Sequence, residues 1–323
     1  MLATRFTGLV GCDAPVQLAG MGVSTIGLAT AVARAGGLGT ISSAWLGTPE
    51  RAGRAIEAIG DVTPGALAVN VLVCMSEQLD LIEAAAERVR VIDFFWGDPR
   101  ADLVERAHRG GALVSWQVGS VDEARLAEDA GCDVIIAQGT EAGGHVRGQV
   151  PLFELLDDVL DHVGIPVLAS GGIGSPRRLA AVLAAGAAGA RIGTRFVSAI
   201  ETGAHPDYVK ALADAENDDS IATGAFSVNC PLCPSTHRVL RSALEAAQAC
   251  SDETVGYIEV RGTQLPVPRF SFIPPTTTTT GQIGAMALYA GRGVGHCRHG
   301  QNAADILREL VDGATTLLGS TTS

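Results

Sequence analysis

Apolar runs rich in Val and Ile alternate along this chain with Ala-rich stretches of helical periodicity. Runs of the first kind are typical of strands, and stretches of the second kind are typical of helices. The eight candidate strands begin near Pro15, Gly37, Leu67, Val89, Ala112, Asp133, Pro166 and Ala188. Their starts are 21 to 33 residues apart, as in repeated βα units. The pattern predicts an α/β fold, a (β/α)8 TIM barrel. A doubly wound sheet is disfavoured because its glycine fingerprint is absent after the first strand.

Start and stop signals place several of the intervening helices. Thr48 and Ser175 each precede a proline, which favours an N-cap followed by the first helical residue. Ser120 stands three residues before Glu123, which is the spacing of a capping box. Gly60 ends a helical stretch just before a strand, as other glycines of the chain do. The glycine excess, 40 of 323 residues, therefore serves the barrel in part.

The repeating pattern ends near residue 200. Residues 201–280 hold a loop with Pro and Cys and a run of threonines, which predict an appended lid subdomain near the C-terminus. The barrel itself is expected to comprise residues 1–200 and 281–323. Two helices are expected in the last part, over 283–291 and 302–318. The second one is amphipathic, so we expect it to pack on the barrel exterior.

Charge and cysteine usage narrow the class of protein. With Lys+Arg 23 against Asp+Glu 35 the formal net charge is −12, which argues against nucleic-acid and anionic-membrane partners. The seven cysteines are scattered in a chain long enough to bury a core, so we expect reduced thiols rather than a disulfide framework. No apolar run reaches the roughly 18 residues of a membrane helix. We expect a cytoplasmic protein, and its oligomeric state stays open.

Glycines gather at the ends of the last two barrel strands. SGGIG at 170–174 precedes a helix start, and GTRF at 193–196 follows the eighth strand. Barrels bind phosphate at this place, with glycine N–H groups and the N-terminus of a short helix. Arg195 either adds charge to such a site or forms a salt bridge elsewhere. These residues are compatible with FMN, a sugar phosphate or a nucleotide as the ligand.

The segment after the sixth strand, AQGTEAGGHVRG, carries a candidate catalytic side chain. Its glycines allow a tight loop over a flat ligand, and His145 lies at the apex of the loop. A histidine among glycines at the catalytic end of a barrel has little packing to do, so we interpret it as an acid, a base or an anion-binding donor. Glu141 either orients this histidine or is solvated.

Two further segments offer weaker signals. Cys230, Cys233 and His237 have a metal-ligand spacing, with Cys250 or Cys297 as a fourth ligand. A single CxxC is weak support for zinc, so we expect no metal ion in the active site. The Gly-rich loop at 291–300 follows no strand and therefore lacks the context of a dinucleotide site. It either lines the cofactor entrance or forms a turn.

Six blocks of the chain together resemble the nitronate monooxygenases, formerly called 2-nitropropane dioxygenases. They are AGMG at the first strand, Val69-Asn70 on the third, AQGTEAGGH, ASGGI, GTRF and the late GAMALYAG. The resemblance covers nearly the whole chain in the right order. It implies an FMN-dependent barrel from the superfamily that also holds flavin enoyl-acyl-carrier-protein reductases and some NADH:quinone reductases.

The resemblance also implies a set of site residues. His145 matches the active-site histidine of the family. The flavin would be held by Gly20, Met21, Gly22, Asn70, Gln117, Gln138, Gly143, Gly144, Ser170, Gly171, Gly172, Gly193, Thr194, Met286 and Tyr289. Of these, the residues from Ser170 to Thr194 would hold the phosphate. Gln117 stands where the family has Lys or Gln, and a neutral side chain stabilises an anionic reduced flavin less than Lys would.

The chain departs from the family pattern at three places. Gly20 replaces a usual proline, and HVRG carries an extra residue after His145. The segment NCPLCPSTH at 229–237 is not a family pattern and falls in the region expected to shape substrate access.

Three functions remain open on the sequence. The leading prediction is oxidation of alkyl nitronates by O2 to a carbonyl compound and nitrite, with His145 holding the nitro group or removing an α-proton. The alternative is NAD(P)H-dependent reduction of an enoyl thioester, enone or quinone by the same flavin. A barrel that binds a phosphate ligand without flavin is the third.

Overall fold

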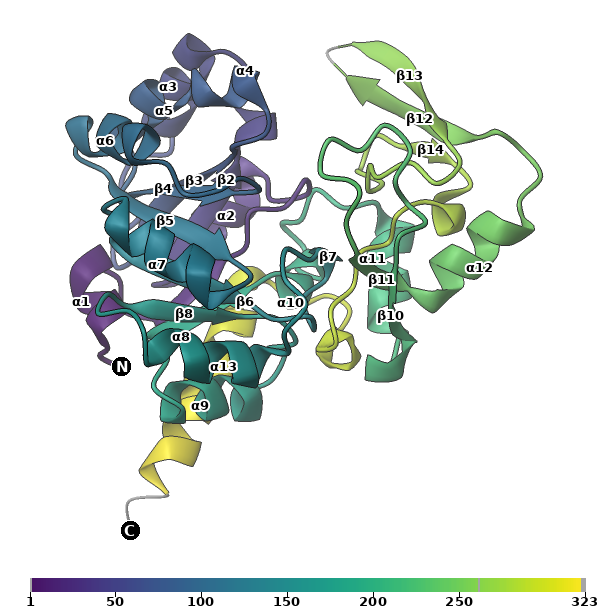
Figure 1. Cartoon of the computed structure of the whole chain (residues 1–323). Helices are drawn as coiled ribbons and strands as arrows, with labels where there is room; N and C mark the ends of the chain where they lie inside the picture. Colours follow the sequence, from purple (N-terminus) through teal and green to yellow (C-terminus); the bar gives the residue numbers. More distant parts are fainter. Residues whose placement is uncertain (1, 261, 321–323) are drawn as a thin grey trace.

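Eight parallel strands close into a barrel in the computed structural model, which describes residues 2–260 and 262–320 (Figure 1). The strands are β1 (Val16–Leu18), β2 (Leu38–Ser42), β3 (Ala66–Leu72), β4 (Val91–Phe95), β5 (Leu113–Val118), β6 (Val134–Gln138), β8 (Val167–Ser170) and β9 (Gly189–Ile192). Each begins within two residues of its predicted position, and β9 pairs with β1 to complete the ring. The predicted (β/α)8 barrel is confirmed.

Helices cover the outside of the barrel. They are α2 (Ile26–Arg34), α3 (Pro49–Glu57), α4 (Ser76–Leu79), α5 (Ile82–Ala86), α6 (Ala101–Arg109), α7 (Val121–Asp129), α8 (Leu152–Leu160), α9 (Pro176–Ala184) and α10 (Thr194–Val197). The predicted caps are present: the hydroxyls of Thr48, Ser120 and Ser175 accept hydrogen bonds from backbone N–H groups in the first turns of α3, α7 and α9. The amphipathic last helix, α13 (Ala303–Gly319), packs against α9 and α2 as expected.

A short N-terminal helix closes one end of the barrel. Phe6 and Val10 of α1 (Arg5–Val10) are buried in one cluster with side chains of the barrel strands, among them Leu38 and Ile136. The Thr4 hydroxyl, which caps α1, also donates a hydrogen bond to the carbonyl of Ala188. The N-terminal end of the barrel is therefore filled, and the opposite end is left for the loops that follow the strands.

The region after residue 200 builds two small sheets beside the barrel (Figure 1). Its elements are α11 (Pro206–Ala213), β10 (Ser220–Thr223), β11 (His237–Leu240), α12 (Arg241–Ala249), β12 (Thr254–Val260), β13 (Thr263–Pro268) and β14 (Thr280–Gly281). One sheet has the order β13-β12-β14. The other has the order β10-β11-β7, and its strand β7 (Gly144–His145) comes from the barrel loop after β6. The lid is thus tied to the barrel through backbone pairing.

The segment after β14 packs with the lid. The predicted helix over 283–291 is wrong: only η3 (Ile283–Ala285), a single turn, forms there. Leu240 and Ala290 donate backbone hydrogen bonds to Leu288 and Arg238, so the chain runs extended alongside β11. This sheet-edge pairing outweighs the local preference for a helix. Two further single turns, η2 (Asn217–Asp219) and η4 (Val294–His296), lie in the same region, and η1 (Ser43–Trp45) follows β2.

Three apolar cores follow from this arrangement. The largest lies between the barrel strands and the helices around them, and another fills the lower barrel with α1. The remaining core belongs to the lid and includes Ala285 to Leu288, which the sequence assigned to the barrel part at 281–323. The division at residues 200 and 281 stays a prediction.

No helix within the described ranges combines the length and the apolar character needed to cross a membrane.

Gly39 on β2 offers a test of how closely α2 packs on the sheet. A Cβ at this position would overlap the carbonyl oxygen of Ala29 on α2. We expect Gly39→Ala to lower the free energy of unfolding by about 1–3 kcal/mol through overpacking. Gly8 on α1 has open space around it, so Gly8→Ala should be neutral or stabilise by about 0.5–1 kcal/mol. Urea unfolding of both variants checks this, and equal losses would contradict the proposed packing.

Candidate active site

A cavity of about 370 Å³ lies at the carboxyl ends of the barrel strands and under the lid. Every predicted site residue except Met286 lines it: Gly20, Met21, Gly22, Asn70, Gln117, Gln138, Gly143, Gly144, His145, Ser170, Gly171, Gly172, Gly193, Thr194 and Tyr289. Met286 lies instead in the apolar core of the lid, where it is 2% exposed. The sequence blocks thus converge on one cavity, which the lid closes with Leu232, Phe272 and Pro274.

A buried ion pair lies beside this cavity inside the barrel. Arg191 of β9 lines the cavity and donates to Asp93 of β4 over 2.9 Å, with both side chains almost inaccessible. Asn70 and Ser115 also donate hydrogen bonds to the Asp93 carboxylate. The strand register places Asn70, Asp93 and Ser115 in one row of the sheet. The amide of Asn70, expected to bind the flavin, is thereby held in a fixed orientation.

Sequence reasoning missed Asp93 and Arg191, although a signal was present. Each is the one charged residue of its strand, within VIDFF and GARI. A charged residue in a fully buried strand needs a partner, and two such residues of opposite sign in one barrel point to each other.

Glycines let three loops approach one another at the predicted phosphate end. Gly171 and Gly172 have φ values of 126° and 66°, which side chains with a Cβ rarely adopt. A Cβ on Gly143 would lie 2.5 Å from the backbone nitrogen of Gly291. The N–H of Gly291 donates to the Thr194 hydroxyl over 3.0 Å. The Gly-rich segment at 291–300 therefore lines the cavity, through Gly291 and Gly293.

Arg195 forms a salt bridge, which is one of the two roles that the sequence left open. The residue lies at the cavity, but its side chain is inaccessible and forms an ion pair with the partly exposed Glu309 and a hydrogen bond with Gln301. Its Nε and Nη1 atoms are buried without a hydrogen-bond partner among the described residues. The ion pair therefore joins α10 to α13, and the guanidinium does not reach the cavity.

His145 lies on β7, opposite His237 of β11 in the strand register. It is 9% exposed and faces the rings of Trp96, His237, Phe272 and Tyr289, with centroids 5.1 to 6.5 Å away. Burial, and to a lesser degree the neighbouring His237, lowers the pKa of His145 from 6.5 to about 3. The imidazole is therefore neutral at pH 7.

The loop around His145 is fixed by groups other than Glu141, for which the sequence left open whether it orients the histidine or is solvated. The carboxylate of Glu141 accepts a hydrogen bond from Leu152 at the start of α8, so it does not orient the histidine. The side chain of Gln138 instead donates to the carbonyl of His145 and accepts from the N–H of Arg147. Arg147 then forms ion pairs with Glu123 and Asp98.

Two cysteines of the lid approach the same histidine. The expectation of reduced thiols is wrong for Cys230 and Cys233, whose Cα atoms are 5.5 Å apart and whose sulfurs form a disulfide. The Nε2 atom of His145 lies 3.3 Å from Sγ of Cys230 and 3.9 Å from Sγ of Cys233. The CxxC spacing on a tight loop brings the two sulfurs together. The expectation of reduced thiols was based on the scattered distribution of all seven cysteines and not on this local spacing.

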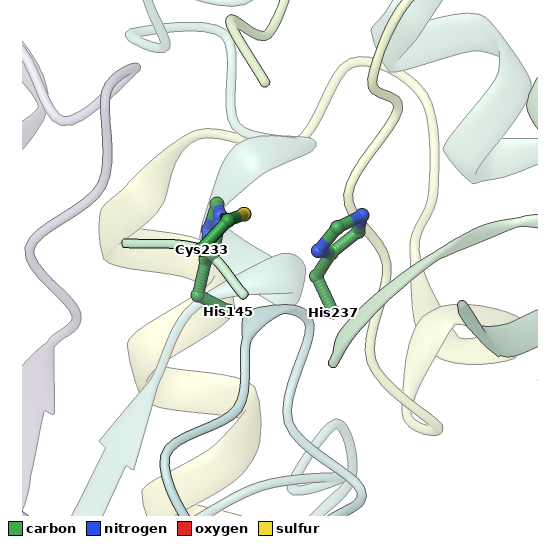
Figure 2. A group of neighbouring side chains, drawn as sticks. All are labelled: His145, Cys233 and His237. Atoms are coloured by element: carbon green, nitrogen blue, oxygen red, sulfur yellow. Dashed lines mark hydrogen bonds between the residues drawn. The ribbon is translucent and has the colours of Figure 1, made fainter. Parts of the chain in front are cut away.

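Three side chains at the same place could together hold a metal ion (Figure 2). Ligand atoms of His145, Cys233 and His237 lie within 4.8 Å of one another, and one ring nitrogen of His237 faces the other two side chains. Cys250 and Cys297, considered as further ligands, have other partners: Gln282 for Cys250, and the Thr194 carbonyl for Cys297. The sulfur of Cys233 is shared with the disulfide in this structure.

Comparison with known proteins gives matches along most of the chain. A family model described as nitronate monooxygenase matches residues 3–90 and 81–313. A probable nitronate monooxygenase of Staphylococcus saprophyticus is 31% identical over 274 residues, which cover 70% of this chain and 77% of that protein.

Two other matches carry different names. The (3aS,4S,5R,7aS)-5-hydroxy-7a-methyl-1-oxo-octahydro-1H-indene-4-carboxyl-CoA dehydrogenase of Mycobacterium tuberculosis is 38% identical over 249 residues, 75% of this chain and 67% of that protein. The solved structure of FabK from Thermotoga maritima has a TM-score of 0.79 and 27% identity, and the match covers 100% of this chain and 99% of that one.

The low pKa of His145 links protein stability to pH. Below about pH 6.5 the unfolded chain binds a proton at this residue, whereas the folded protein does so only near pH 3. We expect the free energy of unfolding to fall as pH drops from 6.5 toward 3, by up to about 1.4 kcal/mol per unit from this group. His145→Asn should have a shallower slope in urea unfolding at pH 7, 6, 5 and 4. The exposed His162→Asn is the control, and parallel curves for wild type and His145→Asn would contradict the expectation.

The ion pair of Asp93 and Arg191 predicts a strong effect of removing one charge. Asp93→Asn leaves the Arg191 guanidinium buried without its counter-charge, and we expect a loss of about 3–5 kcal/mol in urea unfolding. Adding Arg191→Met should recover part of the loss, because no buried charge remains. Asp102→Asn, which breaks an exposed ion pair with Arg100, should change stability little. If Asp93→Asn lowered the free energy of unfolding as little as this control does, the buried pair would contribute no more to stability than an exposed one.

Proposed function

We propose that this chain, which belongs to the nitronate monooxygenase family, uses FMN to oxidise alkyl nitronates with O2 to a carbonyl compound and nitrite. The family is one of flavin-dependent oxidoreductases, and the chain is an enzyme of that kind. The flavin species, the substrate and the residue roles below are our proposal.

The residues of the cavity fit FMN in shape and in hydrogen-bonding groups. The phosphate would be held by the loop Ser170 to Gly172 and by Gly193 and Thr194. The ring would be held by Gly20, Met21, Gly22, Asn70, Gln117, Gln138, Gly143 and Gly144. A Cβ at Gly20 would overlap the side chain of Asn70, so glycine at this departure from the family pattern leaves the amide in place. Bound FMN would accept electrons from the substrate and pass them to O2.

The burial of His145 among aromatic rings is the observation that supports a nitronate as substrate, because burial lowers the pKa of the imidazole and keeps it neutral. A conjugate acid with a pKa of about 3 makes His145 a weak base, and general bases work best when their pKa is near the working pH. Removal of the α-proton from a neutral nitroalkane is therefore disfavoured. A nitronate has already lost this proton and needs only a hydrogen-bond donor, which one N–H of the neutral ring provides.

Apolar side chains of the lid and barrel complete the substrate end. Leu232, Phe272, Tyr289 and Phe95 line the cavity, and Phe272 and Tyr289 face His145. The hydroxyl of Tyr289 donates to the carbonyl of Phe272 over 2.6 Å, and burial raises its pKa, so it stays protonated. These groups exclude water and shape a pocket for a small alkyl chain. O2 would be the second substrate.

The alternative is an NAD(P)H-dependent reductase of an enoyl thioester, enone or quinone on the same barrel. It is favoured by the likeness to a protein named as a carboxyl-CoA dehydrogenase, over 249 residues. The apolar wall of the cavity also suits an acyl chain or a ring. For either function we propose that the protein is cytoplasmic, and its oligomeric state stays open.

The test is oxygen uptake by FMN-loaded protein with propyl-2-nitronate. We expect turnover with the nitronate to exceed turnover with neutral 2-nitropropane, because His145 is a weak base. His145→Ala should keep bound FMN, seen in the absorbance spectrum, and lose turnover about 100-fold or more. The exposed His162→Ala is the matched control.

Three outcomes would change the conclusion. No oxygen uptake with nitronates would refute the proposal, and rapid anaerobic bleaching of the flavin by NADH or NADPH would establish the alternative. A colourless protein that takes up no FMN would refute both.

A further inference from the structure

The loop Cys230 to Cys233 lies between the solvent and the cavity, and the proposed reaction does not use its disulfide. Leu232, between the two cysteines, lines the cavity, whereas Pro231 and Pro234 on either side are exposed. Both cysteines are half-buried, and the exposed prolines beside them place the loop at the surface. The loop therefore lies between thiols in solution and His145, the residue that we propose faces the substrate.

We propose that Cys230 and Cys233 form a redox-active disulfide that exchanges with thiols, with His145 stabilising the thiolate of Cys230. The reductant is a thiol, either of low molecular weight or the dithiol of a protein. This site deepens the proposed function, because His145 belongs to both, but the thiol exchange itself does not require flavin or nitronate.

Contrast with other cysteines supports this assignment. Cys12, Cys132 and Cys297 are buried, and burial raises the pKa of their thiols to about 12, 12 and 11, so they stay protonated and unreactive. Cys230 and Cys233 have a partly exposed position and a histidine nitrogen 3.3 and 3.9 Å from their sulfurs. Low thiol pKa values are typical of CxxC motifs.

The exchange balances as two displacements at sulfur. A thiolate attacks Sγ of Cys233 and forms a mixed disulfide, and Cys230 leaves with the electron pair of the broken S–S bond. The new thiolate of Cys230 accepts a hydrogen bond from Nε2–H of His145. A second thiol, as thiolate, attacks the sulfur of the reductant, and Cys233 leaves in turn. The pair gains two electrons and two protons, and two thiols of the reductant become one disulfide.

Reduction would change the state of His145. In the disulfide, the sulfurs have no proton to give and carry no charge. In the dithiol, Cys230 interacts with Nε2 of His145 in one of two ways. It is either a thiolate beside an imidazolium or a thiol whose S–H donates to Nε2, and in both cases this nitrogen is occupied. The other titratable groups that face the ring are His237 from β11 and Tyr289, both uncharged here because burial lowers the pKa of the first and raises that of the second. Provided that the proposed function holds, the dithiol form should turn over nitronates more slowly than the disulfide form.

The first experiment measures the redox equilibrium without any activity assay. The full-length protein is equilibrated in mixtures of reduced and oxidised glutathione, its thiols are alkylated, and the labelled peptides are identified by mass spectrometry. We expect Cys230 and Cys233 to interconvert together, with a tenfold change in their ratio for about every 30 mV, as for a two-electron couple. Cys230→Ser and Cys233→Ser should each abolish the transition, whereas Cys250→Ser should leave it unchanged. A pair that stays reduced, or stays oxidised, across all mixtures would overturn the proposal.

The second experiment isolates the part of His145. The rate of alkylation of Cys230 is measured against pH in reduced protein, for wild type, His145→Asn and the control His162→Asn. We expect the midpoint of the wild-type profile to lie below the ordinary cysteine pKa of about 8.5, and His145→Asn to raise it by about one unit, a tenfold slower reaction at pH 7. Identical profiles would overturn the role of His145. Stoichiometric zinc in the purified protein that blocks alkylation until it is chelated would show a metal site instead of a redox pair. Absence of nitronate oxidation would leave both readouts intact and would refute only the proposed function.

Discussion

The pairing of β7 with β11 is the contact on which the catalytic end of this molecule depends. Two register pairs, His145 with His237 and Gly144 with Arg238, join the loop after a barrel strand to a sheet of the lid. The pairing places His145 under the lid, where burial makes it neutral, and beside the cysteine loop that precedes β11. Residues 288–290 continue along the same side of β11 as β7, where Leu240 donates to Leu288 and Ala290 donates to Arg238, while β10 pairs with the opposite side. The cavity therefore exists because the lid continues the backbone hydrogen bonding of a barrel loop.

Electrostatics inside the site differ from those of the whole chain. The formal net charge is −12, yet the groups nearest the cavity either cancel or are neutral. Arg191 is balanced by Asp93, and His145 carries no charge at pH 7. Arg195 has a counter-ion in Glu309 but retains two unpaired nitrogens. An anionic ligand would thus be bound mainly by backbone N–H groups, and the acidic surface acts mainly at a distance.

The sequence predicts what is local and repeated. Period and strand composition locate the eight barrel strands to within two residues, and the prolines after Thr48 and Ser175 locate helix starts. Motif blocks identify the cavity lining apart from Met286, whose block forms an extended segment at a sheet edge rather than a helix. Contacts between distant segments could not be predicted. A two-residue strand such as β7 has no periodicity, and nothing in the chain shows that His237 lies beside a histidine 92 positions earlier. The Asp93 to Arg191 pair needed only the recognition that lone charges in buried strands must meet.

His145 links the choice of substrate to the chemistry of the lid. Its neutrality depends on a low dielectric and on the lack of an anionic partner, since the nearest groups are aromatic rings, a second neutral histidine and a disulfide. An anion placed against this ring, whether a nitronate or a cysteine thiolate, would raise the pKa of the imidazole, because opposite charges stabilise each other strongly in a buried site. Substrate and Cys230 would then compete for the same proton. In a family barrel without the cysteine loop only the substrate could supply that charge, so NCPLCPSTH is where this chain gains a second means of controlling the histidine.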